Sequence, residues 1–156
     1  MIVVDTNILL YLYLPGPATE QCNELLKRDA DWSAPAIWRS EFCNALLLYL
    51  RKKLIAADFA TQIVHAAEDL VGGNEAKSNP ADVMRLALDS RCTFYDCEFV
   101  AAAKSHATIL VTEDKALLNA FPKVAFSLSN ALKRVRKVKP HAQNTSRRYA
   151  QRSVAD

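Results

Sequence analysis

The sequence is poor in three residue types that organise many binding and catalytic sites. Its 156 residues include only three glycines, four cysteines and three histidines. The glycines form neither GxGxxG nor GxxxxGK[ST], so a dinucleotide-binding or nucleoside-triphosphate-binding loop has little support. His65, His106 and His141 are too scattered for a nucleophilic triad, and we expect them on the surface. Any catalytic chemistry is therefore expected from other side chains.

The cysteines predict neither a disulfide framework nor a zinc site. Cys22, Cys43, Cys92 and Cys97 contain no CxxC pair and have no histidine at zinc-finger spacing. Because several have small apolar neighbours, we expect them to be reduced core residues.

Long apolar runs are also missing. The longest covers seven residues, Ile8 to Leu14, whereas a membrane span needs roughly 18–20. The first residues, MIVVD, lack the basic and apolar regions of a secretory signal. We therefore expect no membrane segment and a cytoplasmic location.

The remaining composition is that of a packed globular domain, with 51% hydrophobic and 24% charged residues. Short β-branched or apolar segments alternate with segments of helical spacing. This alternation predicts an α/β fold, in which a central parallel sheet lies between helices in a single three-layer domain. The expected strands are 2–4, 32–34, 108–112 and 124–126, and the expected helices are 19–29, 35–53, 56–71, 80–91, 95–105, 115–121 and a last one capped by Ser129.

The charges divide the chain into two parts. Residues 133–156 hold eight Lys or Arg and one acid, a net charge of +7, whereas residues 1–132 hold 12 basic and 16 acidic side chains, a net charge of −4. We therefore expect a globular domain over 1–132 and a basic, partly disordered extension over 133–156.

Four carboxylates from distant segments are expected to meet. Asp5 follows the first strand, and Asp114 follows the strand over 108–112. The carboxyl ends of parallel strands share one edge of a sheet, where open α/β sheets bind ligands. Asp96 opens the helix that leads into the second of these strands, and Glu41 lies among apolar residues near the start of another helix.

Taken singly, each acid also fits a structural role: a turn for Asp5, a helix cap for Asp96 or Asp114, and a partly exposed side chain for Glu41. Together they would repel one another by roughly 4 kcal/mol per pair at about 4 Å and an effective dielectric of about 20. A bound cation would relieve this repulsion, and a donor set made only of oxygen favours Mg²⁺ or Mn²⁺ over zinc. Glu113 is a candidate outer group, whereas Glu98 is expected to point away.

Four segments carry a family resemblance. The sequences VVDTN from Val3, YDCEFVAAA from Tyr95 and LVTEDKAL from Leu110, with Glu41 between them, resemble the motifs of the PIN-domain family. Their order and spacing are similar to those of the small VapC-type toxin nucleases of bacterial toxin–antitoxin pairs. The resemblance covers about residues 1–130, and the basic extension lies beyond it.

The resemblance implies a Mg²⁺- or Mn²⁺-dependent endoribonuclease. On it, Asp5, Glu41, Asp96 and Asp114 are the catalytic and metal-binding acids, while Asn7 and Thr112 support them. It further implies a small antitoxin partner and a homodimer. Two alternatives stay open: a PIN nuclease for RNA processing or DNA flaps without an antitoxin, and a non-catalytic module that binds RNA or protein.

The basic extension has two interpretations. It could be a solvated end without a function, or an arm that contacts RNA phosphates and makes affinity depend on salt. The residues expected to contact RNA in the second case are Lys133, Arg134, Arg136, Lys137 and Lys139.

Overall fold

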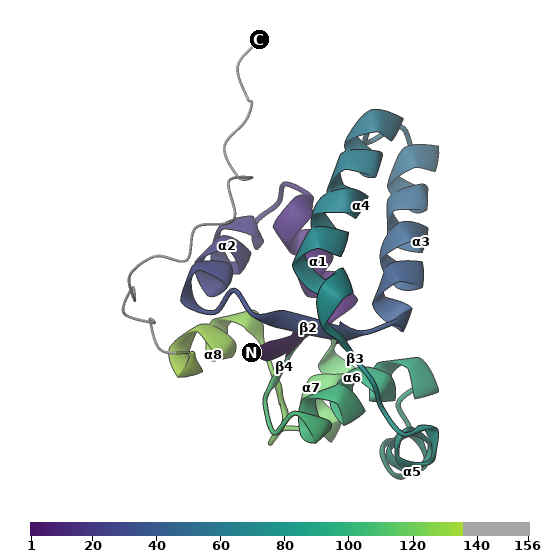
Figure 1. Ribbon diagram of the computed structural model, residues 1–156, viewed down its shortest axis with the longest axis vertical. Helices are drawn as coiled ribbons and strands as arrows, with labels where there is room; N and C mark the ends of the chain where they lie inside the picture. The colour runs from purple at the N-terminus through teal and green to yellow at the C-terminus, as the bar shows by residue number, and fades with distance from the viewer. Residues whose placement is uncertain (136–156) are drawn as a thin grey trace.

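The computed structural model describes residues 1–135 and contains a five-stranded sheet at its centre (Figure 1). The strand order is β3-β2-β1-β4-β5, and every neighbouring pair is parallel. The predicted α/β fold with a parallel sheet is therefore confirmed. The strands are β1 Ile2–Val4, β2 Trp32–Pro35, β3 Glu75–Ala76, β4 Leu110–Val111 and β5 Ala125–Phe126.

Helices cover both faces of the sheet. They are α1 Thr6–Tyr13, α2 Thr19–Arg28, α3 Ile37–Arg51, α4 Ala57–Val71, α5 Pro80–Ser90, α6 Phe94–Ser105, α7 Lys115–Ala120 and α8 Leu128–Arg134. Figure 1 shows α1 to α4 on one side of the sheet and α5 to α7 on the other. The predicted three-layer arrangement is therefore present.

The core forms where the central strands meet the helices. Val3 and Val4 of β1 and Leu110 and Val111 of β4 are fully buried. Helix α6 packs against β1, β2 and β4, and its run of small residues, Ala101 to Ala103, is buried. The first turn of α6 carries Asp96, whose charge acts on Asp5 at the end of β1.

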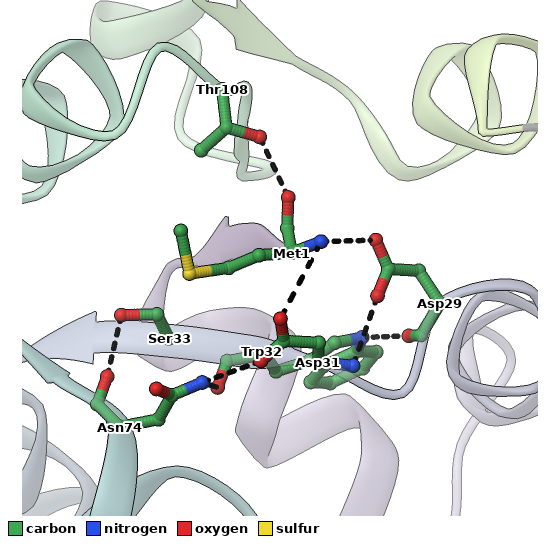
Figure 2. A network of polar contacts seen from close by, with 7 residues as sticks. All are labelled: Met1, Asp29, Asp31, Trp32, Ser33, Asn74 and Thr108. Carbon is green, nitrogen blue, oxygen red and sulfur yellow. Dashed lines mark hydrogen bonds and ion pairs between the residues drawn. The ribbon is translucent and has the colours of Figure 1, made fainter.

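Polar contacts tie together the amino ends of the strands (Figure 2). The amino group of Met1 lies 3.0 Å from Asp29 Oδ2 and 3.7 Å from Asp31 Oδ2, and Thr108 Oγ1 donates to the Met1 carbonyl at 2.8 Å. Asn74 Nδ2 donates to Asp31 Oδ1 at 2.6 Å. These polar groups satisfy one another, so this edge differs from the carboxyl edge, where carboxylates gather.

Several local expectations are wrong. The apolar run after Asp5 forms α1, which the sequence did not predict, and the polar segment 72–79 contains β3. Pro35 ends strand β2 instead of opening α3, and Ser127 rather than Ser129 caps α8, by accepting from the Asn130 N–H.

The cysteines are free, as expected, but do not all lie in the core. Cys22 and Cys97 are buried, Cys92 is partly buried and Cys43 is exposed. His65 and His106 are exposed as predicted, while His141 lies outside the described residues. Within residues 1–135, no helix is both long and apolar enough to cross a membrane.

Candidate active site

Asp5 is the central acid of the carboxyl edge. Its backbone N–H donates to the Val111 carbonyl at 2.9 Å, so it directly continues the pairing of β1 with β4. The residue is only 9% exposed. Its Oδ2 atom accepts from Asn7 Nδ2 at 2.7 Å and from Thr112 Oγ1 at 2.5 Å. The structure thus places the two predicted supporting side chains directly against Asp5.

Burial makes the charged form of Asp5 unfavourable. It raises the pKa of the Asp5 carboxyl from 3.8 to about 6, and the negative charges of Glu41 and Asp96 add to the rise. The hydrogen bonds from Thr112 and from the Thr6 backbone act in the opposite direction. The site therefore favours an added positive charge near Asp5.

Glu41 reaches the same place from α3. Thr6, the residue after Asp5, donates from Oγ1 to Glu41 Oε2 at 2.6 Å. Burial raises the pKa of Glu41, and the charges of Asp96 and Glu98 raise it further. The first residue of α1 therefore links an acid of the sheet edge to an acid of α3.

Glu98 is closer to this site than the sequence indicated. Its negative charge acts on Glu41, and its own pKa is raised by burial. We expected this side chain to point away from the site, and its charge nevertheless acts on Glu41. The available signal was its position within an otherwise apolar stretch of α6, as for Glu41 in α3.

Asp96 combines electrostatic contact with a structural role. Its Oδ2 atom accepts from Thr93 Oγ1 at 2.6 Å and from the Thr93 backbone N–H at 3.3 Å, while Thr93 Oγ1 accepts from the Asp96 N–H at 3.1 Å. This reciprocal pair is a capping box at the start of α6. The charge of Asp96 nonetheless reaches both Asp5 and Glu41.

Asp114 is connected to Asp5 through a hydroxyl group. Its backbone N–H donates to Thr112 Oγ1 at 2.9 Å, and that hydroxyl in turn donates to Asp5 Oδ2. The Asp114 side chain caps α7, because Oδ1 accepts from the N–H groups of Ala116 and Leu117. Asp114 thus lies next to the site while its carboxylate serves a helix.

Glu113 connects the site to the last helix. Its backbone N–H donates to Asn7 Oδ1 at 3.3 Å, and its Oε1 atom accepts from the Leu128 N–H at 2.7 Å. Glu113 therefore holds the start of α8, and the backbone beside it helps to orient Asn7.

The donor chemistry of the site fits a hard divalent cation. The side chains gathered here carry carboxylate, hydroxyl and amide oxygens, and the two carboxylates of Asp5 and Glu41 are destabilised as anions. Within residues 1–135, no three Asp, Glu, His or Cys side chains already form a complete set of metal ligands. Asp96 and Asp114 each use one carboxylate oxygen to cap the helix that they begin.

Of the predicted basic residues, two belong to the described part of the chain. Lys133 and Arg134 are exposed at the end of α8, and the Arg134 guanidinium lies 4.3 Å from the centre of the Phe126 ring. Arg136, Lys137 and Lys139 lie outside the described residues.

The fold and the site together define an α/β protein whose carboxylates cluster at the carboxyl edge of a parallel sheet. Residues 2–126 match the family model of the PIN domain, and the chain belongs to this family.

Similar proteins agree with this assignment. Ribonuclease VapC3 of Pyrobaculum aerophilum is 26% identical over 124 residues, which cover 78% of this chain and 95% of that protein. A crystal structure from Pyrobaculum aerophilum has a TM-score of 0.66 at 23% identity, covering 86% of this chain and 93% of that one. A toxin–antitoxin complex from Klebsiella pneumoniae has a TM-score of 0.61 at 16% identity, covering 82% and 98%. These structures share the fold.

Proposed function

We propose that this protein is a divalent-metal-dependent endoribonuclease. The proposal rests above all on Asp5, a buried acid at the carboxyl edge of the sheet, where the nearby charges of Glu41 and Asp96 make its anionic form still less favourable. The relative named Ribonuclease VapC3 supports RNA as the substrate. The residues proposed as catalytic and metal-binding are Asp5, Glu41, Asp96 and Asp114.

A Mg²⁺ or Mn²⁺ ion held by these carboxylates would lower the pKa of a bound water and neutralise charge that develops on the phosphate. The other side chains position the acids. Asn7 and Thr112 hold one oxygen of Asp5, and Thr6 holds one oxygen of Glu41. A fixed carboxylate does not have to reorganise when a phosphodiester arrives, which favours catalysis.

Cleavage of total RNA tests the activity. We expect the full chain to cleave RNA with millimolar Mg²⁺ or Mn²⁺, and EDTA or the Asp5→Asn substitution to abolish cleavage. Asp58→Asn is the matched control, because Asp58 is an exposed acid on α4 and should not affect the rate. Equal cleavage by wild type and Asp5→Asn would contradict the proposal.

Thermal denaturation tests the metal without relying on activity. A ligand that binds only the folded state raises its melting temperature, so Mg²⁺ or Mn²⁺ should stabilise the wild type. Asp96→Asn should reduce this gain yet preserve the metal-free melting temperature, because an Asn oxygen can still accept from Thr93. Thr93→Ala should do the reverse, lowering metal-free stability by about 0.5–2 kcal/mol through loss of the cap. A large decrease in the metal-free melting temperature of Asp96→Asn would show that Asp96 has only a structural role.

We further propose that the protein is the toxin of a toxin–antitoxin pair. The toxin–antitoxin complex from Klebsiella pneumoniae, which has a similar fold, supports this role. The partner would be a small antitoxin, and the active form a cytoplasmic homodimer. Expression should arrest growth, and Asp5→Asn should abolish the arrest. If the protein cleaves RNA but its expression leaves growth normal, an RNA-processing or DNA-flap nuclease is favoured instead. If it neither cleaves RNA nor arrests growth, a binding module is favoured.

A further inference from the structure

A second concave region lies beside the acid site. It has a volume of about 450 Å³, within the range of small-molecule sites. Its walls come from the end of α1, the following loop, the start of α2, Glu113 and the start of α8. Helix α2 packs against both α1 and α8 (Figure 1).

Two of the residues that line this hollow connect it to the acid site. Asn7, which donates to Asp5, and Tyr11, which lines the hollow, are four residues apart and therefore lie on one face of the helix. Glu113 provides a second connection, because it lines the hollow while its N–H donates to Asn7. An RNA strand with a phosphate at Asp5 would have a neighbouring nucleotide within reach of this hollow.

The chemistry of the walls favours the uncharged part of that nucleotide. Among the residues that the structure describes, no Lys or Arg lines the hollow, whereas Glu113 does, so a phosphate would be repelled. Leu14, Pro17 and Leu128 supply apolar parts of the wall, and the residue Tyr11 is 38% exposed. Aromatic rings of this kind stack on unpaired bases of single-stranded RNA.

Two polar side chains that can form hydrogen bonds with a base edge line the same hollow as Tyr11. Gln21 and Ser129 are exposed and line the hollow, and amide and hydroxyl groups both donate and accept hydrogen bonds. The loop is also fixed in shape. Thr19 Oγ1 donates to the carbonyls of Tyr11 and Leu14 and accepts from the Gly16 N–H. A fixed loop presents a constant shape to an entering base.

We propose that this hollow binds one unpaired RNA base next to the cleaved phosphodiester, with Tyr11 as the stacking platform and Gln21 and Ser129 as groups that select the base. The inference deepens the proposed ribonuclease function and rests on it for the position of the phosphate.

Binding of a short fluorescent single-stranded RNA, followed by anisotropy in EDTA, tests the inference without cleavage. Replacing one nucleotide at a time with an abasic site should weaken binding to the wild type by about 10-fold at one position. Tyr11→Ala should weaken binding of the intact RNA by about the same factor. This variant should then bind the abasic RNA as tightly as it binds the intact RNA. Tyr11→Phe should retain wild-type behaviour, because it keeps the ring.

Phe59→Ala is the matched control, since Phe59 is an aromatic residue of similar exposure, at 36%, that lies on α4 and does not line the hollow. Circular dichroism verifies that each variant folds. Gln21→Ala and Ser129→Ala should change which base is preferred at the sensitive position.

Wild-type affinity in Tyr11→Ala, or an abasic scan without any sensitive position, would overturn the inference. If Tyr11→Ala weakened binding of a partner protein alone, the hollow would be a protein-docking site and the inference would also fail. The ribonuclease proposal would fail on a different observation, namely the absence of metal-dependent cleavage by the wild type. The anisotropy data test the base site without depending on cleavage.

Discussion

At the scale of single residues, Asp5 opposes the stability of the metal-free fold. A buried carboxyl with a pKa of about 6 is bound to its proton more tightly in the folded chain than in the unfolded one, where its value is 3.8. Protonation therefore favours folding, and stability falls as the pH rises from about 4 to about 6. Above pH 6 the buried charge lowers the free energy of unfolding by its full amount, on the order of 3 kcal/mol. A bound cation would offset it.

The first prediction concerns Asp5→Asn. In EDTA at pH 7.5 the variant should melt several degrees above the wild type, because it removes the buried charge while its side-chain oxygen can still accept from Asn7 and Thr112. At pH 5, about midway between the pKa of the unfolded and the folded carboxyl, the gain should be about half as large. Thermal denaturation at both pH values measures it. Asp58→Asn, at an exposed acid, should show no such trend. A gain equal at both pH values would contradict the burial argument.

At the scale of elements, the sequence predicted those parts whose signals are local. The capping box of Thr93 and Asp96 located the start of α6, and β-branched runs located β1 and the region of β4. Helix α1 was missed because seven consecutive apolar residues have no polar face, so periodicity cannot distinguish a buried helix from a strand. Strand β3 has only two residues and depends on its pairing with β2, which no local signal records.

The same reasoning explains what was predicted of the candidate site. The proximity of residues at the ends of β1 and β4 could be predicted, because the carboxyl ends of parallel strands lie at the same edge of a sheet. The hydrogen bond from Thr6 to Glu41 spans 35 positions and could not be derived from spacing. The sequence also left open whether Asp96 and Asp114 cap helices or reach the site. Asp96 and Asp114 were expected at the site, and both carboxylates also cap helices.

Arg39 joins three elements and gives the second prediction. From α3, its Nη2 lies 2.8 Å from Glu68 Oε2 on α4, and its Nη1 lies 2.8 Å from Glu75 Oε1 on β3. The Arg39 side chain is 41% exposed, which limits the value of these pairs. Arg39→Met should therefore lower stability by about 1 kcal/mol, or roughly 2–4 °C in melting temperature.

Arg85→Met is the matched control for Arg39. Arg85 makes a single 3.5 Å contact with Asp82 within α5, and both side chains are mostly exposed, so its loss should be barely measurable. The difference between the two variants should shrink in high salt, which screens exposed pairs. An equal effect of both substitutions would show that the contacts of Arg39 do not connect α3, α4 and β3 energetically.

At the scale of the whole molecule, charge is separated along the chain. Residues 1–132 carry a net charge of −4, which does not attract RNA, whereas residues 133–156 carry +7. Attraction of an anionic substrate to an acidic site needs cations from elsewhere. The described part of the basic segment begins on α8, which packs against α2 and β5, and the Glu113 carboxylate beside the site accepts from its first N–H. The segment thus starts from an element anchored next to the acid site.

The third prediction tests this arrangement in the full chain. Replacing Arg136, Lys137 and Lys139 with Gln should weaken binding of single-stranded RNA most at low salt and reduce the slope of log affinity against log salt by up to about 2, since each lost phosphate contact removes about 0.7. Arg51, Lys52 and Lys53 replaced with Gln give the charge-matched control: they end α3 and the following turn, some ten residues along the helix from Glu41. If the two triple variants lowered the slope equally, only net charge would matter, and the basic extension would have no special contact with RNA.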